Sequence, residues 1–373
     1  MSAIFRKRSS FFLLVLSLSC LCLPARAAPP EEVEPPKEKQ LLLWKVPATG
    51  SRALIPDISL IGTFAGGFFR DDPGDDQGEN PSRTGFNFQG VELAVQSVVD
   101  PYVRGDIFIL FIEDGVEVEE AILSTLSLPL SLQIRGGVLL PKFGRQVTQH
   151  LEKLDFVDFS RVNRHFFGEE GFSELGVELS LLVPVSWFSE ISFEFLQGEN
   201  EGNFDGVRKG DFAYLGHLTN TFDLSNDLTL QTGLSGVFGF NDTARGNSTQ
   251  IYGTDLYLRW KPSPRRGLKW QTEYFLRRRE VVGDTEVEGG LYSQVVGQFA
   301  RRWETGLRFE RIGLPVEGVP EWSLTPTIAF LATEFFRLRA QYSLIDTNAS
   351  THLQHEAFLQ AQFNMGVHGA HSF

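Results

Sequence analysis

Hydrophobic and polar residues alternate along much of this 373-residue chain, and the alternation begins near residue 57. In residues 303–310, Trp, Thr, Leu and Phe occupy the odd positions, whereas Glu, Gly, Arg and Glu occupy the even positions. Residues 190–195 repeat the pattern, because Glu, Ser and Glu alternate there with Ile, Phe and Phe. A period of two predicts β-strands that each have one apolar face and one polar face.

We predict sixteen strands of this kind, separated by turns and polar loops. No stretch after the N-terminus has the roughly 18 apolar residues of a transmembrane helix, so an integral membrane protein of this sequence would be a β-barrel. An even strand number is what a single-chain barrel of the bacterial outer membrane requires. Pro326 interrupts the fourteenth segment and allows a bulge there, because proline lacks a backbone donor. The predicted segments are 57–70, 85–99, 102–113, 115–128, 130–140, 173–183, 187–196, 211–222, 228–240, 250–260, 268–279, 289–300, 303–311, 322–331, 335–343 and 354–367.

Short turns and long polar connections alternate between these segments. This asymmetry is typical of outer-membrane barrels, which have short turns at one rim and longer loops at the other. A β-sandwich has no reason to keep such an alternation, so the pattern favours the barrel. The short turns are 99–102, 128–130, 184–187 and 300–303, and the long connections include 71–85, 197–210 and 241–250.

The third long connection, residues 141–172, is the longest and reads PKFGRQVTQHLEKLDFVDFSRVNRHFFGEEGF. A connection of this length is usually functional or disordered. Its many phenylalanines favour burial over disorder, and a sixteen-stranded barrel encloses a lumen that could receive them. We therefore expect this connection to fold into the lumen and to narrow it.

Three phrases of the sequence resemble a family of porin-like outer-membrane proteins related to the phosphate-selective O and P porins. They are ELAVQSVVDPYVRGDIFI (92–109), GGVLLPKFGR (136–145) and DFSRVNRHFFGEEG (158–171). The resemblance extends over about residues 57–373 and implies a sixteen-stranded barrel with a pore constricted by its third loop. Phosphate selectivity does not follow, because the lysine ladder and phosphate ligands of those porins have no match in this chain.

Both ends of the chain fit export to the outer membrane of a Gram-negative bacterium. Residues 1–27 have the basic start, apolar run and A-x-A site of a signal peptide, and residues 28–56 are expected to be a disordered periplasmic lead-in. Both cysteines, Cys20 and Cys22, lie in the signal, so the mature chain has no disulfide. The last strand ends on Phe373, which resembles the terminal assembly signal of outer-membrane barrels. Residues 57–373 would then form the barrel, with membrane lipid and the barrel assembly machinery as partners.

The charge of the chain argues against nucleic acid as a partner. Loss of the four basic residues of the signal changes the formal net charge from −13 to −17. Inward positions are mainly acidic in the early strands and mainly basic in the tenth to fifteenth strands. Such opposed walls would place a transverse field across the pore, unless the charges simply pair with one another. The lumen-wall residues singled out are Arg135, Arg259, Arg277, Arg308, Arg337, Arg339, Glu92 and Glu178.

The third connection carries balanced charges at the expected pore constriction, so the sequence names no ion. These residues are Lys142, Arg145, Arg161, Arg164, Asp155, Asp158, Glu169 and Glu170. We expect passive diffusion of small polar or charged solutes, including ions, through a water-filled lumen. The alternative is a structural or ligand-gated barrel whose lumen this connection seals. A homotrimer is compatible with either interpretation.

No motif supports an enzyme. His150 and His165 lie near Ser160 in the sequence, but no nucleophile motif accompanies them. The acidic run 71–76 and the histidines of residues 368–371 could ligate a metal, although an acidic surface loop and a terminal tail are the favoured explanations. We therefore predict neither catalytic residues, nor a metal site, nor a cofactor.

Overall fold

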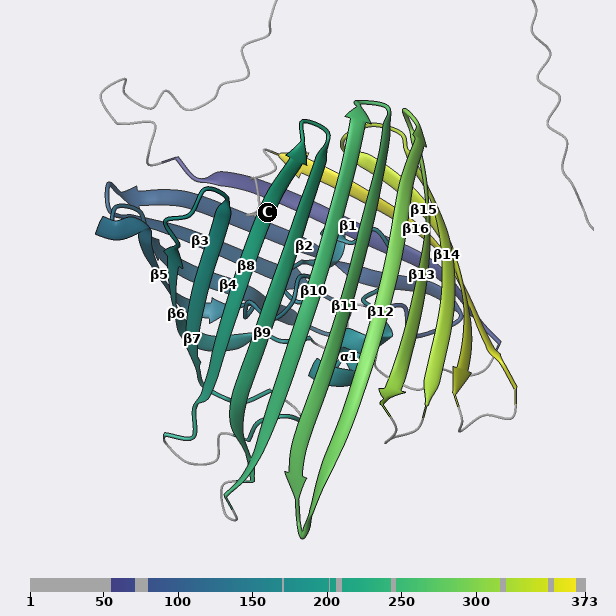
Figure 1. The fold of residues 1–373 in the computed structure, drawn as a ribbon. Helices are drawn as coiled ribbons and strands as arrows, with labels where there is room; N and C mark the ends of the chain where they lie inside the picture. The colour runs from purple at the N-terminus through teal and green to yellow at the C-terminus, as the bar shows by residue number, and fades with distance from the viewer. Residues whose placement is uncertain are drawn as a thin grey trace, which may run out of the picture. The chain divides into compact units, whose positions relative to one another are not determined.

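The sixteen strands close into one antiparallel barrel, in which β1 pairs with β16 and every other strand pairs with its neighbours in sequence (Figure 1). This computed structural model describes residues 55–70, 80–169, 171–200, 202–205, 210–242, 246–315, 320–347 and 352–366. The strands are β1 (Asp57–Phe69), β2 (Gly85–Asp100), β3 (Val103–Phe111), β4 (Val116–Thr125), β5 (Leu132–Leu139), β6 (Glu174–Leu182), β7 (Phe188–Leu196), β8 (Ala213–Ser225), β9 (Leu228–Asp242), β10 (Asn247–Ser263), β11 (Arg266–Val281), β12 (Asp284–Ala300), β13 (Trp303–Leu314), β14 (Glu321–Leu331), β15 (Phe336–Thr347) and β16 (Gln354–Gly366).

All sixteen predicted segments coincide with these strands, so the predicted fold class is confirmed. The strict alternation of short and long connections is wrong, because β9 to β12 are longer than predicted. Only residues 243–246 separate β9 from β10, and β11 and β12 form a tight hairpin that projects past its neighbours (Figure 1). At Pro326 the strand continues without a register shift, although two ladder pairs with β15 are missing.

The two faces of the strands differ as the alternation predicts. Outward residues such as Phe193 and Leu307 are 62% and 49% exposed, whereas inward Ser192 and Arg308 are at most 1% exposed. The alternation within the predicted segment 211–222 places His217 on the lipid-facing side, and the structure corrects this prediction. His217 is buried instead, and its ring is hydrogen-bonded to Ser235 Oγ at 2.7 Å and to Thr219.

The belt of apolar side chains on the outer face extends over nearly every strand, from Phe64 on β1 to Leu359 on β16. Soluble monomers rarely expose continuous apolar patches of this extent. Among the described residues, no helix is long and apolar enough to cross a membrane.

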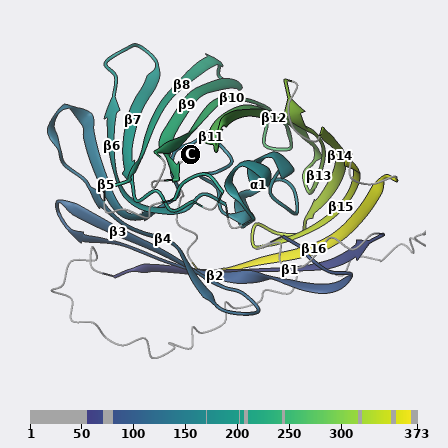
Figure 2. The same ribbon diagram turned by 90° about the horizontal axis from the view of Figure 1, so that it is seen from below.

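The β5–β6 connection, residues 140–173, is the longest connection of the barrel and contains two of the three helical elements among the described residues. It includes the 3-10 helix η3 (Leu151–Lys153) and the α-helix α1 (Arg161–Phe167), and a second 3-10 helix, η2 (Pro129–Ser131), precedes β5. Ser160 caps α1 by accepting a hydrogen bond from the Asn163 amide at 3.1 Å. Figure 2 shows α1 within the ring of strands.

Candidate functional site

The start of the β5–β6 connection is fixed by a carboxylate on the opposite side of the barrel. The backbone amides of Arg145 and Gln146 donate to the two carboxylate oxygens of Glu273 on β11, at 3.1 and 2.9 Å. Gly144 donates to Ser235 Oγ at 2.9 Å. A Cβ on Gly144 would lie 2.2 Å from Glu273 Oε2, and its φ of +64° also favours glycine. This residue therefore has to be glycine for the chain to approach the wall.

Phenylalanines of the connection form an apolar core with inward residues of the strands. Phe143, Phe166 and Phe167 surround Phe275 of β11, with ring centroids 5.3 to 5.9 Å apart. Glycines on the inner wall leave room for them, since a Cβ on Gly253 would lie 2.8 Å from Phe143. A core of this kind excludes water from part of the barrel interior. Its buried members are Ile122, Leu139, Phe143, Val147, Val162, Phe166, Phe167, Phe172, Leu196, Phe204, Ala213, Leu215, Val237, Ile251, Phe275, Tyr292 and Ile312.

The acidic wall, formed by β6 and β7, binds the first basic residue of the connection. Lys142 Nζ lies 2.8 Å from Glu178 and 2.6 Å from Glu190, and its backbone amide donates to Glu194 at 2.7 Å. Arg135 of β5 completes the cluster through a 2.7 Å contact with Glu178. Burial alone would lower the pKa of Lys142, but Glu178 and Glu190 raise it above its usual value. Lys142 therefore stays charged at neutral pH.

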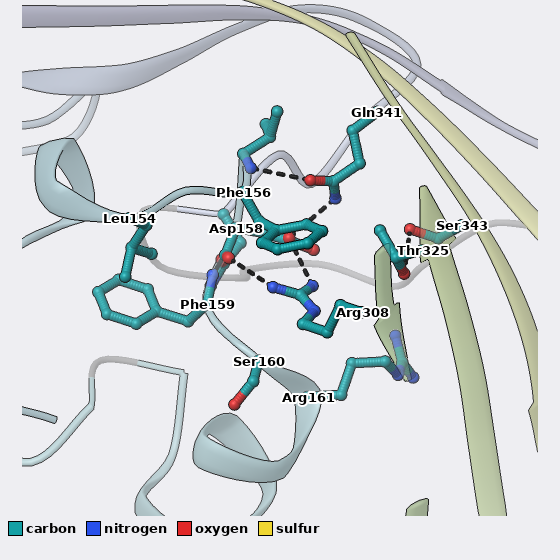
Figure 3. A network of polar contacts seen from close by, with 12 residues as sticks. Leu154, Phe156, Asp158, Phe159, Ser160, Arg161, Arg308, Thr325, Gln341 and Ser343 are labelled. Carbon is teal, nitrogen blue, oxygen red and sulfur yellow. Dashed lines mark hydrogen bonds and ion pairs between the residues drawn. The ribbon is translucent and has the colours of Figure 1, made fainter. Parts of the chain in front are cut away.

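The basic wall binds the acidic residues of the connection (Figure 3). Arg308 of β13 donates to Asp158 Oδ1 at 2.7 Å and to the Asp158 carbonyl at 3.1 Å, and its guanidinium lies over the Phe156 ring. Gln341 of β15 donates to the same carboxylate at 2.8 Å and accepts from the Val157 amide at 2.8 Å. Arg308 and Gln341 therefore both bind the segment around Asp158 through partners of matching chemistry.

Two further residues of the basic wall hold the neighbouring part of the connection. Lys269 of β11 pairs with Asp155, and Arg339 of β15 donates to the carbonyls of Leu154 and Phe156. Burial alone would raise the pKa values of Asp155 and Asp158, but Lys269 and Arg308, respectively, lower them below the usual value near 3.8. Both carboxylates are therefore ionised at neutral pH.

The remaining predicted constriction residues lie around α1. The backbone amide of Arg161 donates to Glu310 at 2.7 Å, and its side chain pairs with Glu321. Arg164 pairs with Glu169 at 3.1 Å. Glu170, Phe373 and both metal-binding candidates, residues 71–76 and 368–371, lie outside the described residues.

The predicted lumen-wall residues fall into the same network with one exception. Besides the pairs above, Arg277 pairs with Glu288 at 3.0 Å, Arg337 donates to the Glu152 carbonyl at 2.9 Å, and Glu92 lies near His150. Arg259 is exposed near the β10–β11 turn and takes no part in the network among the described residues. Since the connection carries charges complementary to both walls, these pairs neutralise much of the charge on which the predicted transverse field depended.

Two cavities remain beside the connection along β4 to β10. The first is lined by the connection itself, including Val147, His150, Phe159 and Phe167, together with Glu117 and Glu119 of β4. The second is polar, and its lining includes Arg135, Lys142, Arg145, Glu190 and Asp255. Leu140 lines both cavities. Glu119 lines the first cavity, and its neighbour in sequence, Glu120, lines the second. The two cavities therefore adjoin at Leu140.

No protein-family model matches the sequence. Solved structures with a similar fold include an anion-selective porin from Comamonas acidovorans, with a TM-score of 0.59 and 11% identity over 83% of this chain and 100% of that chain. The in-vitro folded OmpT of Vibrio cholerae in its trimer form has a TM-score of 0.57 and 10% identity over 83% of this chain and 99% of that chain. Salmonella typhi OmpF in complex with daunomycin has a TM-score of 0.57 and 10% identity, covering 83% and 97% of the two chains. At identities this low, the comparisons establish a similar fold and nothing more.

One protein is also similar to this chain in sequence, over most of its length. An uncharacterized protein of Aquifex aeolicus (strain VF5) is 31% identical over 401 residues, covering 90% of this chain and 84% of that protein. The narrower relation to the phosphate-selective O and P porins stays a prediction. The chain belongs to the same family as this Aquifex aeolicus protein, and its barrel has the fold of outer-membrane porins.

Proposed function

We propose that this protein is a non-enzymatic porin of the bacterial outer membrane whose β5–β6 connection fills most of the lumen. The observation that carries the proposal is the set of buried contacts joining the connection to strands on opposite sides of the barrel. Lys142 reaches β6 and β7, whereas Asp158 reaches β13 and β15. A segment anchored on both sides has to cross the interior between them.

The proposed solute path follows the two cavities past Leu140. The polar cavity presents Arg135, Lys142 and Arg145 together with Glu190 and Asp255, so both signs of charge meet a passing solute. A lining of mixed sign favours small polar solutes over apolar ones and selects neither anions nor cations strongly. The path lies beside the connection, because the apolar core occupies the space around Phe275.

A location in the outer membrane and assembly from the periplasm belong to the same proposal. The apolar outer belt and the porin fold support membrane insertion, and an antiparallel barrel leaves no unpaired edge in lipid. The trimer form of the Vibrio cholerae neighbour makes a homotrimer a reasonable assembly to test.

A sealed structural barrel is the second candidate, and the burial of the network favours it. Arg308 and Arg339 are each 1% exposed and Glu273 is 0% exposed, which is unusual for charged residues facing a wide aqueous pore. In this case the cavities would be closed at Leu140, and the intact protein would conduct no ions.

Single-channel recording in planar bilayers separates the two candidates. We expect the intact barrel to show a small conductance, and Leu140→Trp to reduce it several-fold, because indole fills the junction of the cavities. Leu307→Trp is the matched control, since Leu307 is an outward residue of β13 and its substitution should leave conductance unchanged. An intact barrel that never conducts would refute the path and support the sealed barrel.

Assembly gives a further prediction at the end of the chain. Phe373→Ala should lower the amount of folded barrel in the outer membrane while export across the inner membrane continues, because the terminal aromatic is the expected assembly signal. The measurement compares heat-modifiable barrel in outer-membrane fractions with total exported chain, and Phe335→Ala, at a strand end, is the control. Normal assembly of the Phe373 variant would show that the last residue carries no signal.

A further inference from the structure

Four carboxylates gather around one imidazole where the β5–β6 connection meets β2 and β4. His150 of the connection faces Glu92 of β2 together with Glu119 and Glu120 of β4, and Glu152 interacts electrostatically with Glu92. His150 is 4% exposed and Glu92 is 5% exposed. Three possible metal-ligand atoms, one from each of Glu92, Glu119 and His150, all lie within 4.8 Å of one another. His150 and Glu119 also line the first of the two cavities described above, but the proposed solute path gives none of these contacts a role.

A β-bulge brings two consecutive glutamates to this place. Phe108 and Ile109 of β3 pair with Glu120 and Val118 of β4, so Glu119 is an extra residue between them. In a regular strand consecutive side chains point to opposite faces, and one of the two glutamates would face lipid. Bulges commonly re-aim side chains at functional sites. Here the bulge lets both carboxylates contact the same imidazole.

The distances around the His150 ring differ between its two nitrogens. One nitrogen makes a hydrogen bond, and the other lies near two carboxylates at the spacing of metal ligands. His150 Nε2 lies 3.1 Å from Glu120, a normal hydrogen bond that leaves the lone pair on Nδ1. Nδ1 lies 3.4 Å from Glu92 and 3.3 Å from Glu119, longer than a typical N–H···O bond. For metal–ligand bonds of about 2.1 Å, a tetrahedral site has ligand–ligand edges of about 3.4 Å. Metal-bound histidines are commonly oriented in this way, because the ring nitrogen that does not bind the metal donates a hydrogen bond to a carboxylate.

A small cavity and an excess of negative charge adjoin the cluster. The cavity has a volume of about 10 Å³, close to what one water or ion needs, and its lining includes Glu92, Glu119 and Glu152 but not His150. Glu92 Oε1 is buried and has no hydrogen-bond partner among the described residues. Of the nearby cations, Arg135 is shared between Glu120 and Glu178, and Lys153 interacts with Glu152 and Glu92. A buried excess of carboxylate requires protons or a cation.

We propose that Glu92, Glu119 and His150 Nδ1 bind a divalent first-row transition-metal cation, with Glu152 as a further ligand and Glu120 as the positioning residue. A nitrogen ligand among carboxylates favours Zn²⁺ or Mn²⁺ over Ca²⁺ or Mg²⁺, which prefer all-oxygen sites. The cation joins the connection to β2 and β4. This site stands independently of solute passage, because its ligands are complete whether the pore is open or sealed.

Calorimetric titration of the metal-stripped, detergent-folded mature barrel with Zn²⁺ and Mn²⁺ at pH 7 tests the site. We expect His150→Gln and Glu119→Gln each to remove one equivalent of bound metal. Glu120→Gln should retain the site but weaken it about 10- to 100-fold, as loss of the residue that orients a metal-bound histidine does. His165→Gln is the matched control, because His165 also contacts a glutamate, Glu288 at 2.9 Å, and should bind metal as the wild type does.

The alternative to the cation is a second proton on His150, which would satisfy the same carboxylates. In that case the wild type and His150→Gln would bind the same number of equivalents, and the proposal would be wrong. Because the residual histidines 368 and 371 could also take up metal, the decisive quantity is the difference between variants. X-ray absorption at the zinc edge is the second measurement, and a loaded protein without an oxygen-rich shell containing one imidazole would overturn the assignment.

Discussion

Replacing residues 144–168 by a short Gly-Ser linker is expected to raise the single-channel conductance several-fold. The strands alone form a closed barrel of sixteen, a size that leaves an aqueous channel when nothing fills it. The deletion removes the phenylalanines that pack around Phe275 and the acidic residues that cover the basic wall. Solutes would then meet basic and acidic residues of the wall directly, among them Arg308 and Glu273, so the enlarged pore should pass both anions and cations more readily.

The control for this deletion shortens another connection at the same rim. Removal of residues 72–78 from the β1–β2 connection should leave conductance unchanged, because it retains Asn80, whose side chain accepts a hydrogen bond from the Phe159 amide at 3.0 Å. Circular dichroism and heat-modifiability establish that each variant still forms a barrel. If the variant with the shortened β5–β6 connection has the same single-channel conductance as the intact protein, the connection does not obstruct the lumen. A large pore that appears only after the deletion would identify the connection as a seal.

The strands could be predicted because their physical cause is local. Polar inward residues alternate with apolar outward residues that face lipid, so the strands appear in the sequence as a period of two in polarity. The contrast fails at His217, since its strand also has Leu215 on the inner face, buried in the apolar core around Phe275. Apolar residues on both faces make the parity ambiguous, which explains the wrong orientation predicted for His217.

The partners within the interior could not be predicted, because they join residues far apart in sequence with no periodic signal. Arg308 and Asp158 are separated by 150 positions, and Glu273 binds amides 127 and 128 positions away. The bulge that turns Glu119 and Glu120 toward His150 also leaves no mark in the alternation. One usable signal was present, namely inward glycines such as Gly253, which leave room for a phenylalanine from elsewhere.

Asp158→Asn is expected to release the β5–β6 connection from the basic wall. Arg308 is 1% exposed and keeps its charge when Asp158 is neutralised, so the variant leaves the buried guanidinium with Glu310, at 3.2 Å, as its remaining ion-pair partner among the described residues. Removing one partner of a buried ion pair typically costs about 3–5 kcal/mol, and the retained contact with Glu310 places the expected cost at the lower end, about 3 kcal/mol. The Gln341 amide would also lose its 2.8 Å contact with a charged acceptor. The barrel itself should remain closed, because its backbone ladder does not involve Asp158.

Limited digestion with trypsin measures this release. The connection contains five cleavable residues, all half-buried in the folded protein: Lys142, Arg145, Lys153, Arg161 and Arg164. When opening is fast relative to cleavage, the cleavage rate follows the population of the open form, so a cost of about 3 kcal/mol should accelerate cutting by about two orders of magnitude. Glu113→Gln is the control, because the Arg83–Glu113 pair is more than half exposed and such pairs contribute at most about 1 kcal/mol. Equal cleavage rates for the two variants would show that the Asp158–Arg308 pair does not hold the connection in place.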